Sequence, residues 1–116
     1  MNSENIQDKL EQIRLSYISS LENKKNAIDT HWCSLKNNWD EEIQGAMYMI
    51  IHGIAGSAET FGMPELTTQA RTVIDLLKQV DPSSPDTDLL QKIDSEIDGL
   101  FIKLKTNYLI ENNWSN

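Results

Sequence analysis

The stretch that decides the fold runs from Ile43 to Gly62 and reads IQGAMYMIIHGIAGSAETFG. Its apolar residues recur at steps of three and four, which is the spacing of one helix face because successive residues turn by about 100°. The residues of this predicted buried face are Ile43, Met47, Ile50, Ile54, Ala58 and Phe61. His52 projects roughly 180° away from the two ends of that face. We therefore expect an exposed histidine on a helix whose other side is buried.

The residues one and two turns from His52 are mostly small or apolar, where a solvated face usually carries Lys and Glu. They are Tyr48, Met49, Ala55, Gly56 and Glu59. A glycine inside a helix costs about 1 kcal/mol relative to alanine, and helices commonly carry that cost where another group approaches the backbone. A group that approached Gly56 would also reach the imidazole. The plain alternative is a surface histidine beside incidental glycines.

The motif continues into the next helix, in the order His52, Gly56-Ser57, Phe61-Gly62 and Pro64-Glu65-Leu66. This pattern resembles the signature of histidine-phosphotransfer (HPt) domains. The resemblance implies that a ring nitrogen of His52 carries a phosphoryl group and that Gly56 leaves room for a partner receiver domain. We place Tyr48, Met49, Ala55 and Glu59 in the same partner-binding surface because they surround His52.

Two positions depart from the family pattern. The usual lysine three residues after the histidine is Ala55, and the position that often carries Glu or Gln on the next helix is Ile74. The predicted helix offers no Lys or Arg near His52, and Glu59 adds negative charge, so we expect the module itself to stabilise a phosphohistidine poorly. Two alternatives follow: a helical adaptor that binds a receiver without being phosphorylated, and a plain dimerising bundle.

Composition bounds the remaining classes. The chain has 116 residues, which suits one domain over residues 1–116, and a formal net charge of −8. Excess negative charge disfavours nucleic acid and anionic membrane surfaces. Cys33 is the only cysteine, and the sequence shows neither a signal peptide nor a membrane span. We expect a cytoplasmic monomer.

The rest of the chain predicts further helices. Apolar residues keep mostly helical spacing from Asn5 to Asn37, with a break near Leu15-Ser16 as an alternative. Asp40 is placed to cap the central helix, Gly62 to end it and Pro64 to begin the next. A loop covers residues 81–85, with Ser84 as the cap of a last helix that ends before Asn112. The sequence predicts an all-α fold, an up-down antiparallel four-helix bundle, with a short extra amino-terminal helix as the variant.

The sequence carries no motif of a stand-alone enzyme. It has no phosphate-binding glycine loop, no nucleophile elbow and no zinc-protease motif. His31 and Cys33 point to different faces of a helix, so they make a poor metal site. We predict a phosphocarrier without metal or cofactor of its own, which receives its phosphoryl group from a receiver phosphoaspartate or a hybrid histidine kinase and passes it to another receiver. Mg²⁺ is expected on the receiver.

Overall fold

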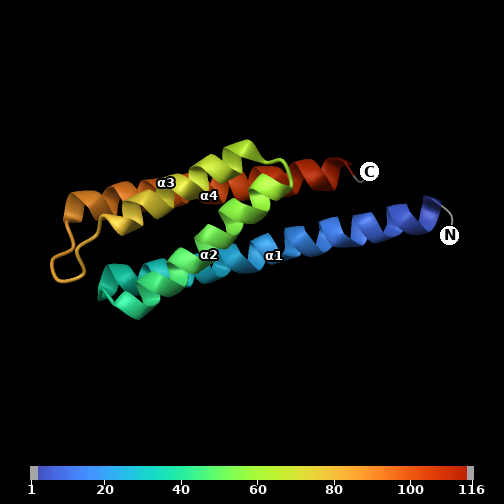
Figure 1. Cartoon of the computed structure of the whole chain (residues 1–116). Helices are drawn as coiled ribbons and strands as arrows, with labels where there is room; N and C mark the ends of the chain where they lie inside the picture. The colour runs from blue at the N-terminus through green and yellow to red at the C-terminus, as the bar shows by residue number, and fades with distance from the viewer. Residues whose placement is uncertain (1–2, 115–116) are drawn as a thin grey trace.

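The protein folds into four helices. The computed structural model describes the backbone of residues 3–114 and the side chains of residues 6–105. The helices are α1 (Ser3–Asn37), α2 (Glu41–Thr60), α3 (Pro64–Lys78) and α4 (Thr87–Trp114), as Figure 1 shows. Residues 3–114 contain no strand. The all-α prediction is therefore confirmed.

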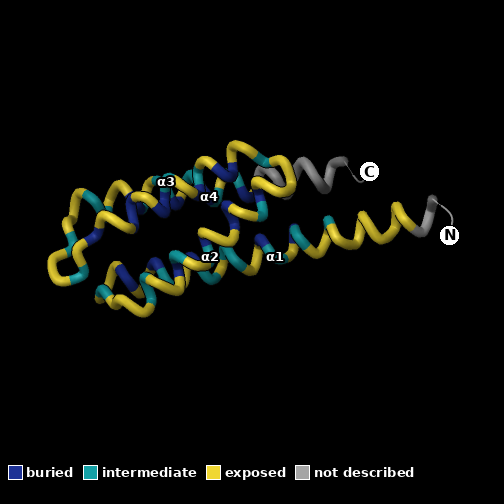
Figure 2. The backbone as a smooth tube through the Cα atoms, viewed as in Figure 1, coloured by how far each residue is buried: buried dark blue, intermediate teal, exposed yellow. Residues whose placement is uncertain are grey.

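The helices enclose one elongated core. Helix α2 packs against α1 and α3, and α4 packs against α3 and α1. The molecule measures 59 × 22 × 19 Å. Figure 2 shows that the buried residues lie where helices face one another. All four helices contribute to a single cluster of buried apolar side chains, whose fully buried members include Ile28, Met47, Leu66, Val73, Ile93 and Leu100.

Helix α1 is continuous from Ser3 to Asn37. The alternative of a separate short helix, breaking near Leu15-Ser16, is not what the chain adopts. Only the second half of α1 is covered by the other helices, and its first turns extend past them, as Figures 1 and 2 show.

The start of α2 is fixed by a side-chain cap. Asp40 Oδ1 accepts hydrogen bonds from the backbone N–H groups of Glu42 and Ile43, at 2.8 and 3.2 Å. These are two of the donors that a helix leaves unpaired in its first turn. Glu41 and Glu42 also place negative charge at the positive end of the helix dipole. The predicted cap is confirmed.

Gly62 ends α2 as predicted. It has a φ of +70° and is the only residue with positive φ in the described backbone. This left-handed conformation lets the N–H of Gly62 donate to the carbonyl of Glu59, at 3.2 Å, and that of Met63 to the carbonyl of Ala58, at 2.8 Å. Pro64 then opens α3 in its first turn.

The start and end of α4 differ from the prediction. Asp86, and not Ser84, caps this helix: its Oδ1 accepts from the N–H of Asp88, at 3.1 Å, and its carbonyl accepts from Leu90. A carboxylate accepts this bond with a full negative charge, which the helix dipole favours over a hydroxyl. The helix continues to Trp114 and does not end before Asn112. Residues 115–116 lie outside the described range.

The buried face of α2 is shifted around the helix relative to the prediction, and Ile43 and Ile50 of the predicted face are only half-buried. Met47, Ile54 and Ala58 are buried as expected, but Ile51 and Ala55 are buried as well. Phe61, at the end of the predicted face, is 48% exposed. The physical reason is that α2 packs against helices on two sides, so its covered arc extends toward α3.

Within the described residues, no helix has the length and apolar character needed to span a membrane.

Candidate functional site

His52 lies on the exposed side of α2. Its ring stacks on that of Tyr48, one turn earlier, with centroids 5.8 Å apart and planes within 7° of parallel. No side-chain hydrogen bond or ion pair joins His52 to another described residue. The Tyr48 ring is therefore the contact that orients the imidazole, and the ring nitrogens are available to a partner. The exposure that the sequence predicted is confirmed.

Helix α3 places a cation over the ring of Tyr48. The Nζ atom of Lys78 lies 5.6 Å from the centroid of the Tyr48 ring. A cation over an aromatic face is attracted by the negative electrostatic potential of that face. Lys78 thus holds positive charge on the ring that stacks on His52. The printed contact of Lys78 is with Tyr48, whose ring in turn stacks on His52.

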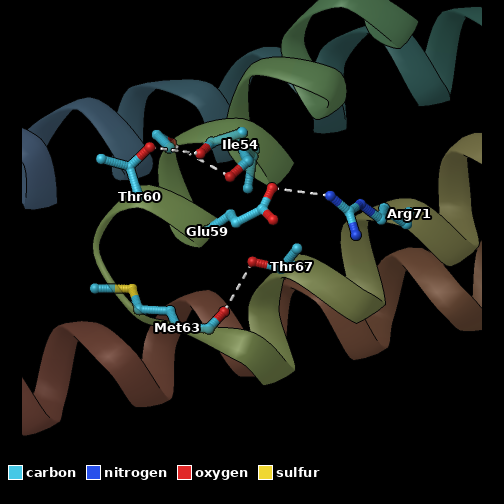
Figure 3. A network of polar contacts seen from close by, with 8 residues as sticks. Ile54, Glu59, Thr60, Met63, Thr67 and Arg71 are labelled. Atoms are coloured by element: carbon cyan, nitrogen blue, oxygen red, sulfur yellow. Dashed lines mark hydrogen bonds and ion pairs between the residues drawn. The ribbon is translucent and has the colours of Figure 1, made fainter.

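Glu59 is paired with a second cation of α3. Its Oε2 lies 2.9 Å from an Nη atom of Arg71, and both side chains are largely exposed, as Figure 3 shows. An exposed ion pair contributes little to stability. It does reduce the negative charge that Glu59 presents on the His52 side of α2. The expected repulsion between Glu59 and a phosphohistidine is therefore reduced.

The other exposed residues of α2 leave room beside His52. A Cβ atom added at Gly56 would meet nothing within 4 Å, and the same holds at Gly53 and Gly45. Met49 is 65% exposed. Between Glu42 and Glu59 the helix has no formally charged side chain, in a chain with a net charge of −8. No contact of the described residues requires glycine at these positions.

Ala55 has to be removed from the predicted partner surface. It is 4% exposed and belongs to the core cluster with Ile51 and Ala58. Its methyl group therefore faces the interior, because the arc of α2 buried against α3 reaches this position. A lysine here would have to leave the core to reach solvent. The cations that contact the exposed side of α2 are Lys78, over the Tyr48 ring, and Arg71, paired with Glu59.

Ile74 is 5% exposed and part of the same core. It offers His52 no hydrogen bond, as its apolar side chain predicted.

No three His, Cys, Asp or Glu side chains of the described residues gather where they could hold a metal ion. His31 is half-buried on α1, and Cys33 is exposed on the same helix.

Helix α1 braces the last turns of α2. The hydroxyl groups of Tyr17 and Ser57 lie within hydrogen-bond distance, at 3.2 Å, and the rings of Tyr17 and Phe61 stack with centroids 4.4 Å apart. Burial is the main cause that raises the pKa of Tyr17 above its ordinary value, so its hydroxyl keeps its proton near neutral pH. This contact holds the end of α2 that follows Gly56.

Sequence reasoning missed Lys78 and Arg71. A helical wheel shows which residues of one helix share a face, but it gives no register between two helices. The available signal was their place on the exposed side of α3, opposite the leucine and valine row.

Comparison with family models, with curated proteins and with solved structures found no match to this chain.

Proposed function

We propose that the protein is a histidine-phosphotransfer module of a phosphorelay, with His52 as the phosphoacceptor. The observation that carries the proposal is an exposed imidazole on a helix side that its own chain leaves open at Gly56. The HPt-like order of residues from His52 to Leu66 supports it. In this proposal the four helices form the up-down antiparallel bundle predicted from the sequence.

The chemistry asks little of this chain. An unprotonated ring nitrogen of His52 attacks the phosphorus of an aspartyl phosphate on a receiver domain. The new N–P bond forms as the bond from phosphorus to the carboxylate oxygen breaks, which releases the aspartate carboxylate. The reverse step passes the group to a second receiver. Such transfer depends on positioning and on neutralising the phosphoryl oxygens. The receiver would supply Mg²⁺, and Lys78 would add positive charge from this side.

The surface around His52 suits a receiver as the partner. The open backbone at Gly56 allows close approach, and Met49 offers a flexible apolar side chain that adapts to a neighbouring surface. The uncharged stretch of α2 can be covered without removing water from a charged group, which is the costly part of burying polar surface. A module of this kind works in the cytoplasm and, in this proposal, as a monomer.

The direct test is phosphoryl transfer to the two histidines of the chain. A receiver phosphorylated on its aspartate is mixed with wild-type protein, with His52→Gln and with His31→Gln, and phosphohistidine is measured by mass spectrometry. We expect phosphohistidine in the wild type and in His31→Gln, and none in His52→Gln. Phosphohistidine that persists in His52→Gln would exclude His52 as the acceptor.

The burial of Ala55 and Ile74 favours one alternative, a helical adaptor that binds a receiver without accepting phosphate. Neither position provides the lysine or the hydrogen-bonding side chain of the family pattern. The adaptor predicts that wild type and His52→Gln bind a receiver equally and that neither forms phosphohistidine. The same experiment, with a binding titration added, separates the two functions.

A further inference from the structure

One aromatic ring lies against the imidazole of His52. The two rings, of Tyr48 and His52, have centroids 5.8 Å apart and planes within 7° of parallel. A centroid distance of this size is typical of a favourable offset stack. An exposed side chain without such a contact exchanges between staggered rotamers, so its ring takes a range of directions. The stack therefore narrows the directions that the imidazole plane can take.

Helix geometry places Tyr48 where it can hold this histidine. Residues four apart lie on the same face of a helix, and helical side chains lean toward the amino terminus. The side chain of His52 therefore leans toward Tyr48, one turn earlier in α2. The other histidine of the chain has no aromatic neighbour at this spacing, because the residue one turn before His31 is Ala27. The supporting ring thus accompanies only the histidine that the proposed function uses.

Tyr48 is itself held by two helices. Its side chain is half-buried and packs against the core cluster, whereas the neighbouring Met49 is 65% exposed. The Nζ atom of Lys78, on α3, lies 5.6 Å from the centroid of the Tyr48 ring. A ring that is already fixed loses little further freedom when a second ring stacks on it. The orientation of His52 is therefore linked to the packing of α3 on α2.

We propose that Tyr48 is a positioning residue for phosphoryl transfer at His52, an inference that rests on the proposed function. The lone pair of an unprotonated ring nitrogen lies in the plane of the imidazole, and transfer requires it in line with the bond that breaks. By fixing that plane, the Tyr48 ring aims the lone pair. The lone pair becomes the N–P bond, and the electrons of the broken P–O bond leave with the aspartate carboxylate of the receiver. The proton on the other ring nitrogen stays there during transfer.

The test separates the aromatic ring of Tyr48 from its hydroxyl group and its bulk. Tyr48→Phe keeps the ring, Tyr48→Leu keeps only an apolar side chain, and Met49→Leu is the matched control at the adjacent position. Transfer from a receiver phosphorylated on its aspartate is measured in single turnovers over a range of receiver concentrations. We expect Tyr48→Leu to lower the maximal rate by about three- to tenfold. Tyr48→Phe and Met49→Leu should keep the maximal rate of the wild type.

Two further measurements distinguish orientation from a general structural role. Phosphoramidate is a small phosphoryl donor that reaches an exposed imidazole from any open direction, so it should phosphorylate His52 equally fast in wild type and in Tyr48→Leu. In proton NMR spectra, the ring current of Tyr48 should shift the ring protons of His52. This shift should persist in Tyr48→Phe and disappear in Tyr48→Leu. Circular dichroism and urea denaturation check that each variant is folded.

Four outcomes would overturn the proposal while the wild type still accepts phosphate on His52. They are equal maximal rates in wild type and Tyr48→Leu, an equal loss in Tyr48→Phe and Tyr48→Leu, a higher half-saturating receiver concentration as the only change, and ring-proton shifts that Tyr48→Leu leaves unaltered. Failure of the proposed function gives a different result, in which the receiver forms no phosphohistidine at His52 of the wild type. That result would refute both proposals together.

Discussion

Two glycines, each inside a helix, have opposite surroundings. A Cβ atom at Gly99 of α4 would lie 2.9 Å from Gln69 Nε2 of α3. That Nε2 donates to the backbone carbonyl of Glu96 and to its carboxylate, both at 2.8 Å. A Cβ atom at Gly56 of α2 would meet nothing within 4 Å. Gly99 makes room for a contact within the molecule, whereas Gly56 makes room for none.

The difference separates two reasons for placing glycine in a helix. Both positions carry the same intrinsic cost of about 1 kcal/mol. At Gly99 the cost is offset by a side-chain network that joins α3 to α4. At Gly56, as at Gly45 and Gly53, no such gain exists within the described residues, and of these three Gly56 is the one that lies a single turn from His52 on the same side of α2. Together with the exposure of His52, the open space at Gly56 supports the proposed docking of a partner at this part of α2.

The largest expected effect comes from the same substitution at both glycines. Gly99→Leu should lower the free energy of unfolding by about 2 kcal/mol, because the added side chain displaces the amide of Gln69 from its two hydrogen bonds with Glu96. Gly56→Leu should change it by less than about 1 kcal/mol, since the side chain enters open space. Urea denaturation measures both. Similar losses at the two positions would break the comparison.

A smaller effect is expected on partner docking. Gly56→Gln should keep the fold and slow phosphoryl transfer from a cognate receiver by at least about tenfold, equal to about 1.4 kcal/mol of transition-state stabilisation, through steric clash. Gly53→Gln is the matched control. It points about 100° away from His52 on the wheel and should slow transfer less. Transfer at the wild-type rate in Gly56→Gln would remove the reason given for this glycine.

Lys78 predicts a weaker, electrostatic effect. If phosphohistidine forms on His52, Lys78→Gln should shorten its lifetime or shift the transfer equilibrium away from it, by up to about tenfold. The effect should shrink at high salt because the site is exposed. Lys92→Gln, an exposed lysine of α4, is the control and should have no effect. Equal decay in both variants would show that the charge on α3 does not reach the phosphoryl group.

The smallest expected effect concerns a second set of side-chain hydrogen bonds between helices, which joins α4 to α1. Asp94 of α4 accepts from the buried indole N–H of Trp32, at 2.7 Å, and from Lys36 Nζ, at 3.1 Å. The Trp32 hydrogen bond, with Lys36 second, holds the pKa of Asp94 below its usual value. The charged carboxylate of Asp94 therefore stabilises the fold at pH values above the pKa that Asp94 has in the unfolded chain. This contribution is lost as pH falls through the lower pKa that Asp94 has in the folded protein.

Asp94→Asn isolates that charge while it keeps an oxygen for the Trp32 indole. Wild type should lose more stability than the variant between pH 6 and pH 3, and the two should differ by less than about 1 kcal/mol at pH 6 because the pair with Lys36 is exposed. Urea denaturation across this pH range is the measurement. Parallel pH profiles would show that the charge of Asp94 adds nothing to the tie between α1 and α4.

The fold could be predicted from local patterns. Asp40, Gly62 and Pro64 act within a few residues of their own positions, so their roles follow from the sequence alone. The start of α4 was mispredicted because Ser84 and Asp86 are both good helix caps, and the charged carboxylate of Asp86 is the acceptor that the helix dipole favours. Local signals of this kind fix where helices begin and end.

The site was predictable only where it depends on one helix. The exposure of His52 and the open space at Gly56 follow from the turn of α2. The burial of Ala55 and the positions of Lys78 and Arg71 depend on how α3 lies against α2, which a single wheel does not contain. For this reason the sequence analysis predicted a partner contact at Ala55, which the structure places in the core. It also did not predict that Lys78 and Arg71 of α3 would contact side chains of α2.

The order in which the helices pack bears on how fast the chain folds. Helix α2 lies against α1 and α3, its neighbours in the chain, and α4 lies against α3, so three of the four helix contacts join segments adjacent in sequence. Only the contact between α1 and α4 joins the two ends of the chain. Proteins dominated by local contacts fold in microseconds to milliseconds. We expect rapid folding of this kind, with the indole of Trp32 reaching Asp94 among the last events, so that Asp94→Ala speeds unfolding more than it slows folding.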